Sequence, residues 1–127
     1  MLNRYSKGSR AERELINYFS EKGFSVIRAA GSGVSSLSPD LLLFKKGKQY
    51  AIESKAWEGE RLSIKKDQFE GLRIWEENTG ITSYIAWRKN REGWNFIPLS
   101  VFKENEASYS IKWESAKMIG RRLEEMI

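Results

Sequence analysis

The sequence predicts a mixed α/β fold in which a central mixed β-sheet is flanked by helices. Three observations predict it: an amphipathic segment begins the chain, three short apolar runs follow, and a second amphipathic segment precedes two further runs. A chain of 127 residues has room for one domain with its own core but not for two. We therefore expect a single domain over residues 1–127.

The first helix is expected over residues 6–21, where apolar side chains recur at helical spacing. Gly23 follows at the position where glycine commonly ends a helix. Glu12 extends the inward-facing stripe of this helix, although a solvated glutamate favoured by the helix dipole is the alternative interpretation. The start of the helix is strongly basic, with cations at Lys7, Arg10 and Arg13.

Strands are expected at residues 24–30, 38–44 and 49–57. The last two are joined by a turn centred on Lys46 and Gly47, where glycine tolerates the positive φ of a tight hairpin. Paired positions then have numbers that sum to 93, so Asp40 lies opposite Glu53. Opposed like charges destabilise a strand pair, and a cation is expected between them. The candidates are Lys55, on the same face as Glu53, and a bound metal ion.

The remaining elements follow in order along the chain. A helix capped by Ser63 is expected over residues 64–77, and strands are expected at 82–87 and 94–99. A weak strand at 108–113 and a short helix that begins at Ser115 complete the chain.

Composition limits the chemistry that this chain can perform. It has no histidine and no cysteine, which excludes imidazole bases, His-containing triads and thiolate zinc sites. Oxygen ligands would hold any metal, which favours magnesium, manganese or calcium. The net charge of +5 favours an anionic partner, with nucleic acid ahead of a membrane surface, unless the charge serves only solubility. Since no signal peptide or membrane-spanning stretch is evident, we expect a cytoplasmic protein.

Four segments in order resemble a known family. They are the basic helix start around Glu12, the strand leading from Gly23 to Ser32, Pro39-Asp40, and Glu53-Ser54-Lys55. Together they resemble the archaeal Holliday junction resolvases of the Hjc type, within the PD-(D/E)xK nuclease superfamily. The resemblance covers most of residues 7–97.

The resemblance implies one restriction-endonuclease-like nuclease core. It also implies a homodimeric enzyme that depends on magnesium, with manganese as a substitute, and that nicks two strands of a four-way DNA junction in recombination and repair. The implied catalytic residues are Glu12, Ser32, Asp40, Glu53 and Lys55. The implied metal ligands are Asp40, Glu53, the Ser54 carbonyl and Glu12, the last through a metal-bound water or a second ion. The expected DNA contacts are Lys7, Arg10, Arg13, Arg28 and Arg88.

Three other interpretations of these residues remain at this point. Lys55 could bridge Asp40 and Glu53 in a structural salt-bridge triad. The chain could be a DNA-binding dimer without activity, which the intact set of acids argues against, or a nuclease of duplex, flap or damaged DNA. Gln68 is placed where some nucleases of the superfamily have a glutamine, but we expect it to be a helix residue. We place the hydrophobic dimer face on the second helix and the last strands, with Phe69, Leu72 and Trp75.

Overall fold

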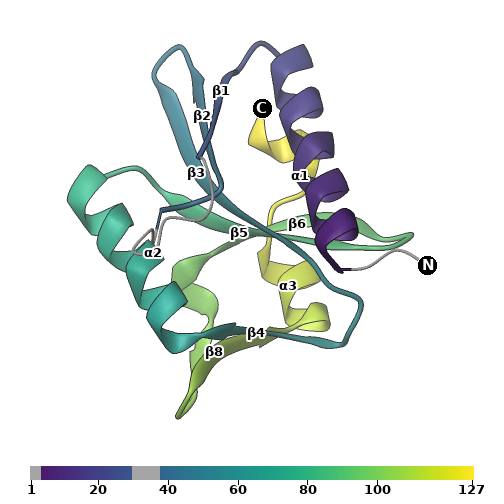
Figure 1. The fold of residues 1–127 in the computed structure, drawn as a ribbon, viewed down its shortest axis with the longest axis vertical. Coiled ribbons are helices and arrows are strands. Elements are labelled where there is room, and N and C mark those ends of the chain that lie inside the picture. Colours follow the sequence, from purple (N-terminus) through teal and green to yellow (C-terminus); the bar gives the residue numbers. More distant parts are fainter. Residues whose placement is uncertain (1–3, 30–37) are drawn as a thin grey trace.

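The computed structural model describes residues 4–29 and 38–127 of the chain (Figure 1). At its centre lies a five-stranded sheet with the order β1-β2-β3-β5-β6. Only β3 and β5 pair in parallel, so the sheet is mixed, as predicted. The elements are α1 (Arg4–Glu21), β1 (Ser25–Arg28), β2 (Leu41–Lys45), β3 (Lys48–Ala56), β4 (Arg61–Lys65), α2 (Lys66–Thr79), β5 (Ser83–Lys89), β6 (Gly93–Pro98), η1 (Leu99–Val101), β7 (Lys103–Glu104), β8 (Ser108–Lys112), α3 (Trp113–Ile119) and η2 (Leu123–Met126).

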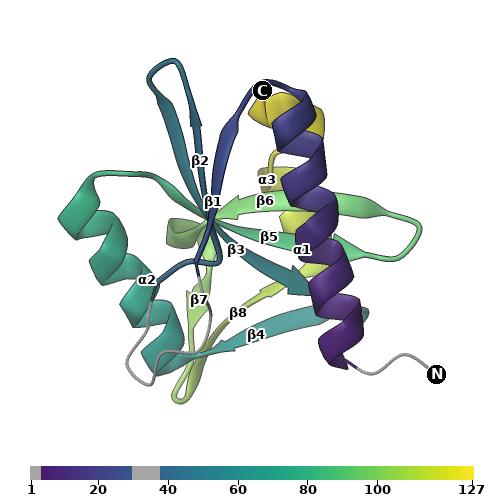
Figure 2. The same ribbon diagram turned by 45° about the horizontal axis from the view of Figure 1, so that its top comes forward.

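The helices α1 and α2 lie on opposite faces of the central sheet (Figure 2). Each face has its own buried core, and successive residues of β5 alternate between the two. Tyr84 and Ala86 pack with residues of α1, whereas Ile85 and Trp87 pack with residues of α2. In the described part of the chain, no helix is both long and apolar enough to cross a membrane.

The hairpin formed by β2 and β3 has the predicted register. Lys45 pairs with Lys48 and Leu41 pairs with Ile52, so each pair of numbers sums to 93. The turn residues Lys46 and Gly47 have φ values of 46° and 88°. Positive φ at both central positions is the geometry of the type I′ turn, whose twist matches that of the two strands.

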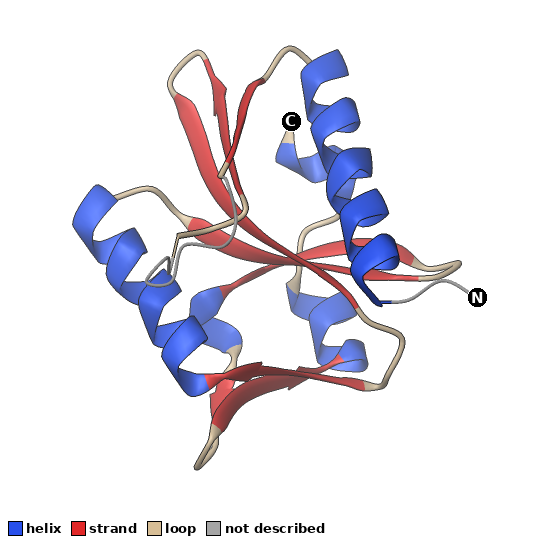
Figure 3. Ribbon diagram, in the orientation of Figure 1, coloured by secondary structure: helices blue, strands red, loops and turns tan. Residues whose placement is uncertain are grey.

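The predicted start of the second helix is wrong, because a strand occupies that segment. In β4, Leu62 and Ile64 are buried between exposed neighbours, which is the alternation of a half-buried strand. Ser63 lies inside this strand opposite Ser110 and does not cap a helix. The strands β4, β8 and β7 form a second, unpredicted sheet, which packs with α2 in one core (Figure 3).

The predicted C-terminal helix is divided into two pieces. The helix α3 already begins at Trp113, and the chain leaves it at Gly120. Arg121 and Phe96 then exchange two backbone hydrogen bonds of 2.8 and 2.9 Å, which pull this segment onto β6. The short helix η2 follows and buries Met126 in the core on the α1 side.

Candidate active site

The hairpin places two carboxylates side by side where β2 begins. The register of the ladder, extended by one residue, brings Asp40 opposite Glu53, as predicted. The backbone N–H of Ser54 donates a hydrogen bond of 2.9 Å to Asp40 Oδ2. Because Ile52 packs in the core on the α1 side, strand alternation directs Glu53 and Lys55 toward α2.

Both carboxyl groups are destabilised in their charged form. Glu53 is only 6% exposed, and its pKa is raised from 4.5 to about 7, mainly by burial and then by the charge of Asp40. Burial is also the main cause that raises the pKa of Asp40. Two carboxylates held together in this way favour a proton or a cation between them.

Lys55 supplies part of that compensating charge. Its Nζ lies 3.5 Å from Glu53 Oε2, and it lowers the pKa of both carboxyl groups. The pKa of Glu53 nevertheless remains well above its ordinary value, because one ammonium does not offset the burial of Glu53 and the neighbouring charge of Asp40. A divalent cation therefore fits the Asp40 and Glu53 pair on charge, and its all-oxygen donors suit magnesium or manganese.

Gln68 lies in α2, as expected, and its side chain also contacts Glu53 and Lys55. Its Nε2 donates a hydrogen bond of 2.9 Å to Glu53 Oε2, and Lys55 Nζ lies 3.4 Å from its Oε1. The side chain comes from the first turn of α2, which begins directly after β4. The available signal was the position of Gln68 after the Glu-x-Lys segment, where some nucleases of the superfamily have a glutamine.

Glu12 lies near this site but is not gathered into it. Its carboxylate pairs with the Arg28 side chain and is close enough to Asp40 to contribute to the raised pKa of that residue. Over residues 4–29 and 38–127, no three acidic side chains approach closely enough to hold one ion. The structure therefore brings Asp40 and Glu53 together and leaves Glu12 beside Arg28.

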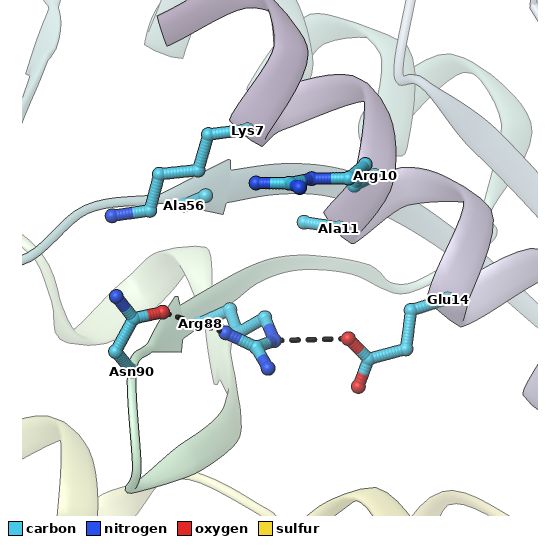
Figure 4. Close-up of a pocket in the computed structure, with 7 residues that line it drawn as sticks. All are labelled: Lys7, Arg10, Ala11, Glu14, Ala56, Arg88 and Asn90. Atoms are coloured by element: carbon cyan, nitrogen blue, oxygen red, sulfur yellow. Dashed lines mark hydrogen bonds and ion pairs between the residues drawn. The ribbon is translucent and has the colours of Figure 1, made fainter. Parts of the chain in front are cut away.

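A basic pocket of about 470 Å³ lies between the start of α1 and the ends of β3 and β5 (Figure 4). Three predicted DNA contacts, Lys7, Arg10 and Arg88, line it together with Glu14 and Asn90. Arg88 is fixed within it, because its Nε donates to Glu14 Oε1 at 2.9 Å and its Nη1 donates to Asn90 Oδ1 at 3.1 Å. The sequence analysis gave no role to the last two residues.

The other predicted residues are placed as follows. Arg13 and Arg28 line a second hollow of about 300 Å³ next to Glu12. Ser32 lies outside the described residues. Two residues of the predicted dimer face are wrong, because Phe69 and Leu72 are buried in the core of the chain itself, whereas Trp75 is half-buried.

The sheet and its acidic hairpin define the class of the protein. A mixed sheet whose central hairpin carries an aspartate and a Glu-x-Lys triplet is the core of a PD-(D/E)xK nuclease. A bacterial homing endonuclease has the same fold, with a TM-score of 0.57 at 15% identity over 88% of this chain and 77% of that chain. This likeness concerns the fold alone.

The chain belongs to the archaeal Holliday junction resolvase (Hjc) family, whose profile matches residues 3–127. It is 33% identical over 128 residues to the crossover junction endodeoxyribonuclease Hjc of Archaeoglobus fulgidus, with 94% of each protein covered. The solved structure of an Archaeoglobus fulgidus Hjc, a Holliday junction resolvase, superposes with a TM-score of 0.82 over 94% of both chains at 30% identity. These matches confirm the family and the fold class expected from the sequence.

Proposed function

We propose that this chain resolves four-way DNA junctions by paired nicks and that the Asp40 and Glu53 pair holds the metal ion that cleavage requires. Its family is one of crossover junction endodeoxyribonucleases, and metal dependence is general among such nucleases. The observation that carries the proposal is the pair formed by the buried Glu53 and the half-buried Asp40, both with raised pKa values, beside Lys55.

The proposed ion is magnesium, with manganese as a substitute. Its ligands would be Asp40, Glu53 and the backbone carbonyl of Ser54, with Glu12 acting on a metal-bound water or a second ion. A bound divalent ion lowers the pKa of its water and stabilises the charge that develops on the phosphate. The Ser54 N–H keeps Asp40 in place for this role through its hydrogen bond.

Lys55 and Gln68 act beside the acids. Lys55 would position the attacking water as the ammonium or deprotonate it as the neutral amine, and the ammonium would stabilise negative charge on the scissile phosphate. Gln68 fixes the orientation of Glu53 through its Nε2 and faces Lys55 with its Oε1. Ser32 is proposed to lie at the same site.

The basic residues of α1 and the neighbouring strands are proposed to bind DNA phosphates. Arg13 and Arg28 lie next to Glu12 in the second hollow, on the expected path of the cleaved strand. Lys7, Arg10 and Arg88 line the larger basic pocket and would bind a phosphate further along the backbone. Phosphate contacts of this kind give affinity and register without reading sequence.

The active form is proposed to be a homodimer of this single nuclease domain. The described residues contain one Asp40 and Glu53 pair per chain, and resolution of a four-way junction requires two nicks. Two copies of the chain would supply two such sites.

Cleavage of a synthetic four-way junction tests the proposal. The junction and a linear duplex built from the same sequences are incubated with the protein and magnesium, and with excess EDTA as the control. We expect nicks in two opposite strands of the junction, and none in EDTA. Equal cutting of the duplex would contradict junction resolution, and binding without any cutting would indicate a DNA-binding protein without activity.

A further inference from the structure

Two cations of the basic pocket are already paired with glutamates of the chain. Lys7 Nζ lies 2.6 Å from Glu58 Oε2, and Arg88 Nε lies 2.9 Å from Glu14 Oε1. Arg10, by contrast, makes no ion pair with any residue in the two described ranges. Figure 4 shows the pair of Arg88 and Glu14. A DNA phosphate that enters the pocket therefore meets two cations that carboxylates already hold.

Each of the two glutamates has a further hydrogen-bond donor besides its cation. Glu14 also accepts a hydrogen bond of 3.0 Å from Nε1 of Trp94, a buried side chain of β6. This second contact makes Glu14 an anchor that fixes Arg88. The pair formed by Lys7 and Glu58 has side-chain exposures of 29% and 40%, close to those of the Arg88 and Glu14 pair, and exposed pairs of this kind exchange readily.

The partners of the Glu58 carboxylate are of the kind that a DNA phosphate would have in this pocket. Besides Lys7, its carboxylate accepts the backbone N–H of Asn90 at 3.0 and 3.1 Å. Burial raises the pKa of Glu58, but the hydrogen bonds from Lys7 and Asn90 and the charge of Arg88 outweigh it and lower the pKa. An ammonium, a backbone N–H and a nearby guanidinium are also typical partners of DNA phosphate oxygens.

We infer that Glu58 is an internal substitute for a DNA phosphate that restrains the affinity of the basic pocket. The inference rests on the proposed binding of DNA by this pocket. Before Lys7 can bind a phosphate it must leave Glu58, so its contact with DNA is an exchange of one anion for another. The net gain in binding free energy at Lys7 is therefore small, and Glu58 limits the affinity of the pocket for any DNA backbone.

The variant Glu58→Gln tests this role directly. The amide keeps an oxygen that can accept the Asn90 N–H, but it releases Lys7. The matched control is Glu104→Gln, which changes the net charge by the same amount. Glu104 lies in β7 of the second sheet and forms an exposed pair of 2.9 Å with Lys66 at the start of α2. Dissociation constants for the four-way junction and for linear duplex are measured in EDTA from about 50 to 200 mM salt.

We expect Glu58→Gln to tighten binding of both DNAs by about two- to fivefold, the range that an exposed ion pair provides. The slope of log K against log salt should steepen by about one, because one more cation now releases a counterion. Glu104→Gln should change the affinity by less than about twofold. The gain from Glu58→Gln should disappear in the Lys7→Gln background, because Glu58 acts through Lys7.

Equal effects of Glu58→Gln and Glu104→Gln would overturn the inference, as would a gain that persists without Lys7. A wild-type protein that cuts the junction but whose affinity is unchanged by Glu58→Gln would overturn this inference alone. A wild-type protein that binds no DNA would overturn the proposed function and the inference together.

Discussion

Gln68 Nε2 donates a hydrogen bond to Glu53 Oε2 over 2.9 Å, while Lys55 Nζ lies 3.4 Å from the Oε1 of the same side chain. One residue of α2 thus holds two residues of β3 that lie on the same face of the strand. The helix is joined to the acidic site through this side chain, and the position of Glu53 depends on how α2 packs.

Gln68→Ala is expected to lower junction cleavage by about 10- to 100-fold, the usual effect of removing a residue that orients a metal ligand. Junction binding in EDTA should stay within about twofold, because no phosphate contact is assigned to Gln68. Single-turnover cleavage rates across a magnesium titration would show the loss, part of which should be recovered at high magnesium. Gln49→Ala is the matched control, since Gln49 is an exposed residue of β3, the strand that carries Glu53. Equal losses of cleavage in both variants would contradict the orienting role of Gln68.

Stability should fall as pH rises in the metal-free protein. The pKa of Glu53 is raised from 4.5 to about 7, so the native state binds more protons than the unfolded state between these values. The free energy of unfolding therefore decreases with rising pH across this window, by on the order of 3 kcal/mol at most. The raised pKa of Asp40 acts in the same direction.

Urea unfolding at pH 5 and pH 8 in EDTA would measure this decrease. Glu53→Gln should remove most of this pH-dependent decrease. When magnesium replaces EDTA, the wild type should regain stability at pH 8. The chain has no histidine or cysteine side chains that would titrate in the same range. A wild-type stability that rises from pH 5 to pH 8 would contradict the assignment.

The tight turn of the hairpin predicts opposite effects for two glycine substitutions. Gly47 has a φ of 88°, where a side chain costs about 1–2 kcal/mol, so Gly47→Ala should destabilise the protein by about that amount. Gly8 lies in α1 with open space around its Cα, and Gly8→Ala should stabilise it by about 0.5–1 kcal/mol. Thermal or urea unfolding would compare the two variants, and the same sign for both would contradict the turn geometry.

Arg10 should contribute more to DNA affinity than its paired neighbours. Because no carboxylate in the described ranges holds it, Arg10→Ala should weaken binding to junction and duplex alike and reduce the salt slope by about one. Arg122→Ala removes an exposed arginine beside Glu124 near the C-terminus and serves as the control. Fluorescence anisotropy at several salt concentrations would test this, and an unchanged slope for Arg10→Ala would remove it from the proposed interface.

Much of the hairpin could be predicted from the sequence because its information is local. The pair Lys46 and Gly47 specifies a two-residue turn, the turn fixes the register, and the register brings Asp40 opposite Glu53. The other residues of the site are positioned by contacts between segments that lie far apart in the sequence. Gln68 reaches Glu53 only because α2 packs on that face of the sheet, and no turn chemistry encodes this placement.

The missed strand has a similar cause. Ile64, Gln68 and Leu72 recur at helical spacing and Ser63 precedes them, so a helix starting at residue 64 was favoured. In the structure, pairing with β8, more than 40 residues away, gives Ser63 and Ile64 a strand conformation, and the helix begins directly at residue 66. The ion pairs of Lys7 and Arg88 could not be predicted from the sequence either, because their glutamate partners lie 51 and 74 residues away along the chain.

The central claim is that the Asp40 and Glu53 pair drives cleavage but not recognition of the junction. Its most direct test measures junction cleavage in magnesium and junction binding in EDTA for Asp40→Asn and Glu53→Gln alongside the wild type. We predict no detectable cleavage by either variant, with dissociation constants within about threefold of the wild type, since neither acid is expected to contact phosphate without a metal ion. Cleavage that survives both substitutions would contradict the account.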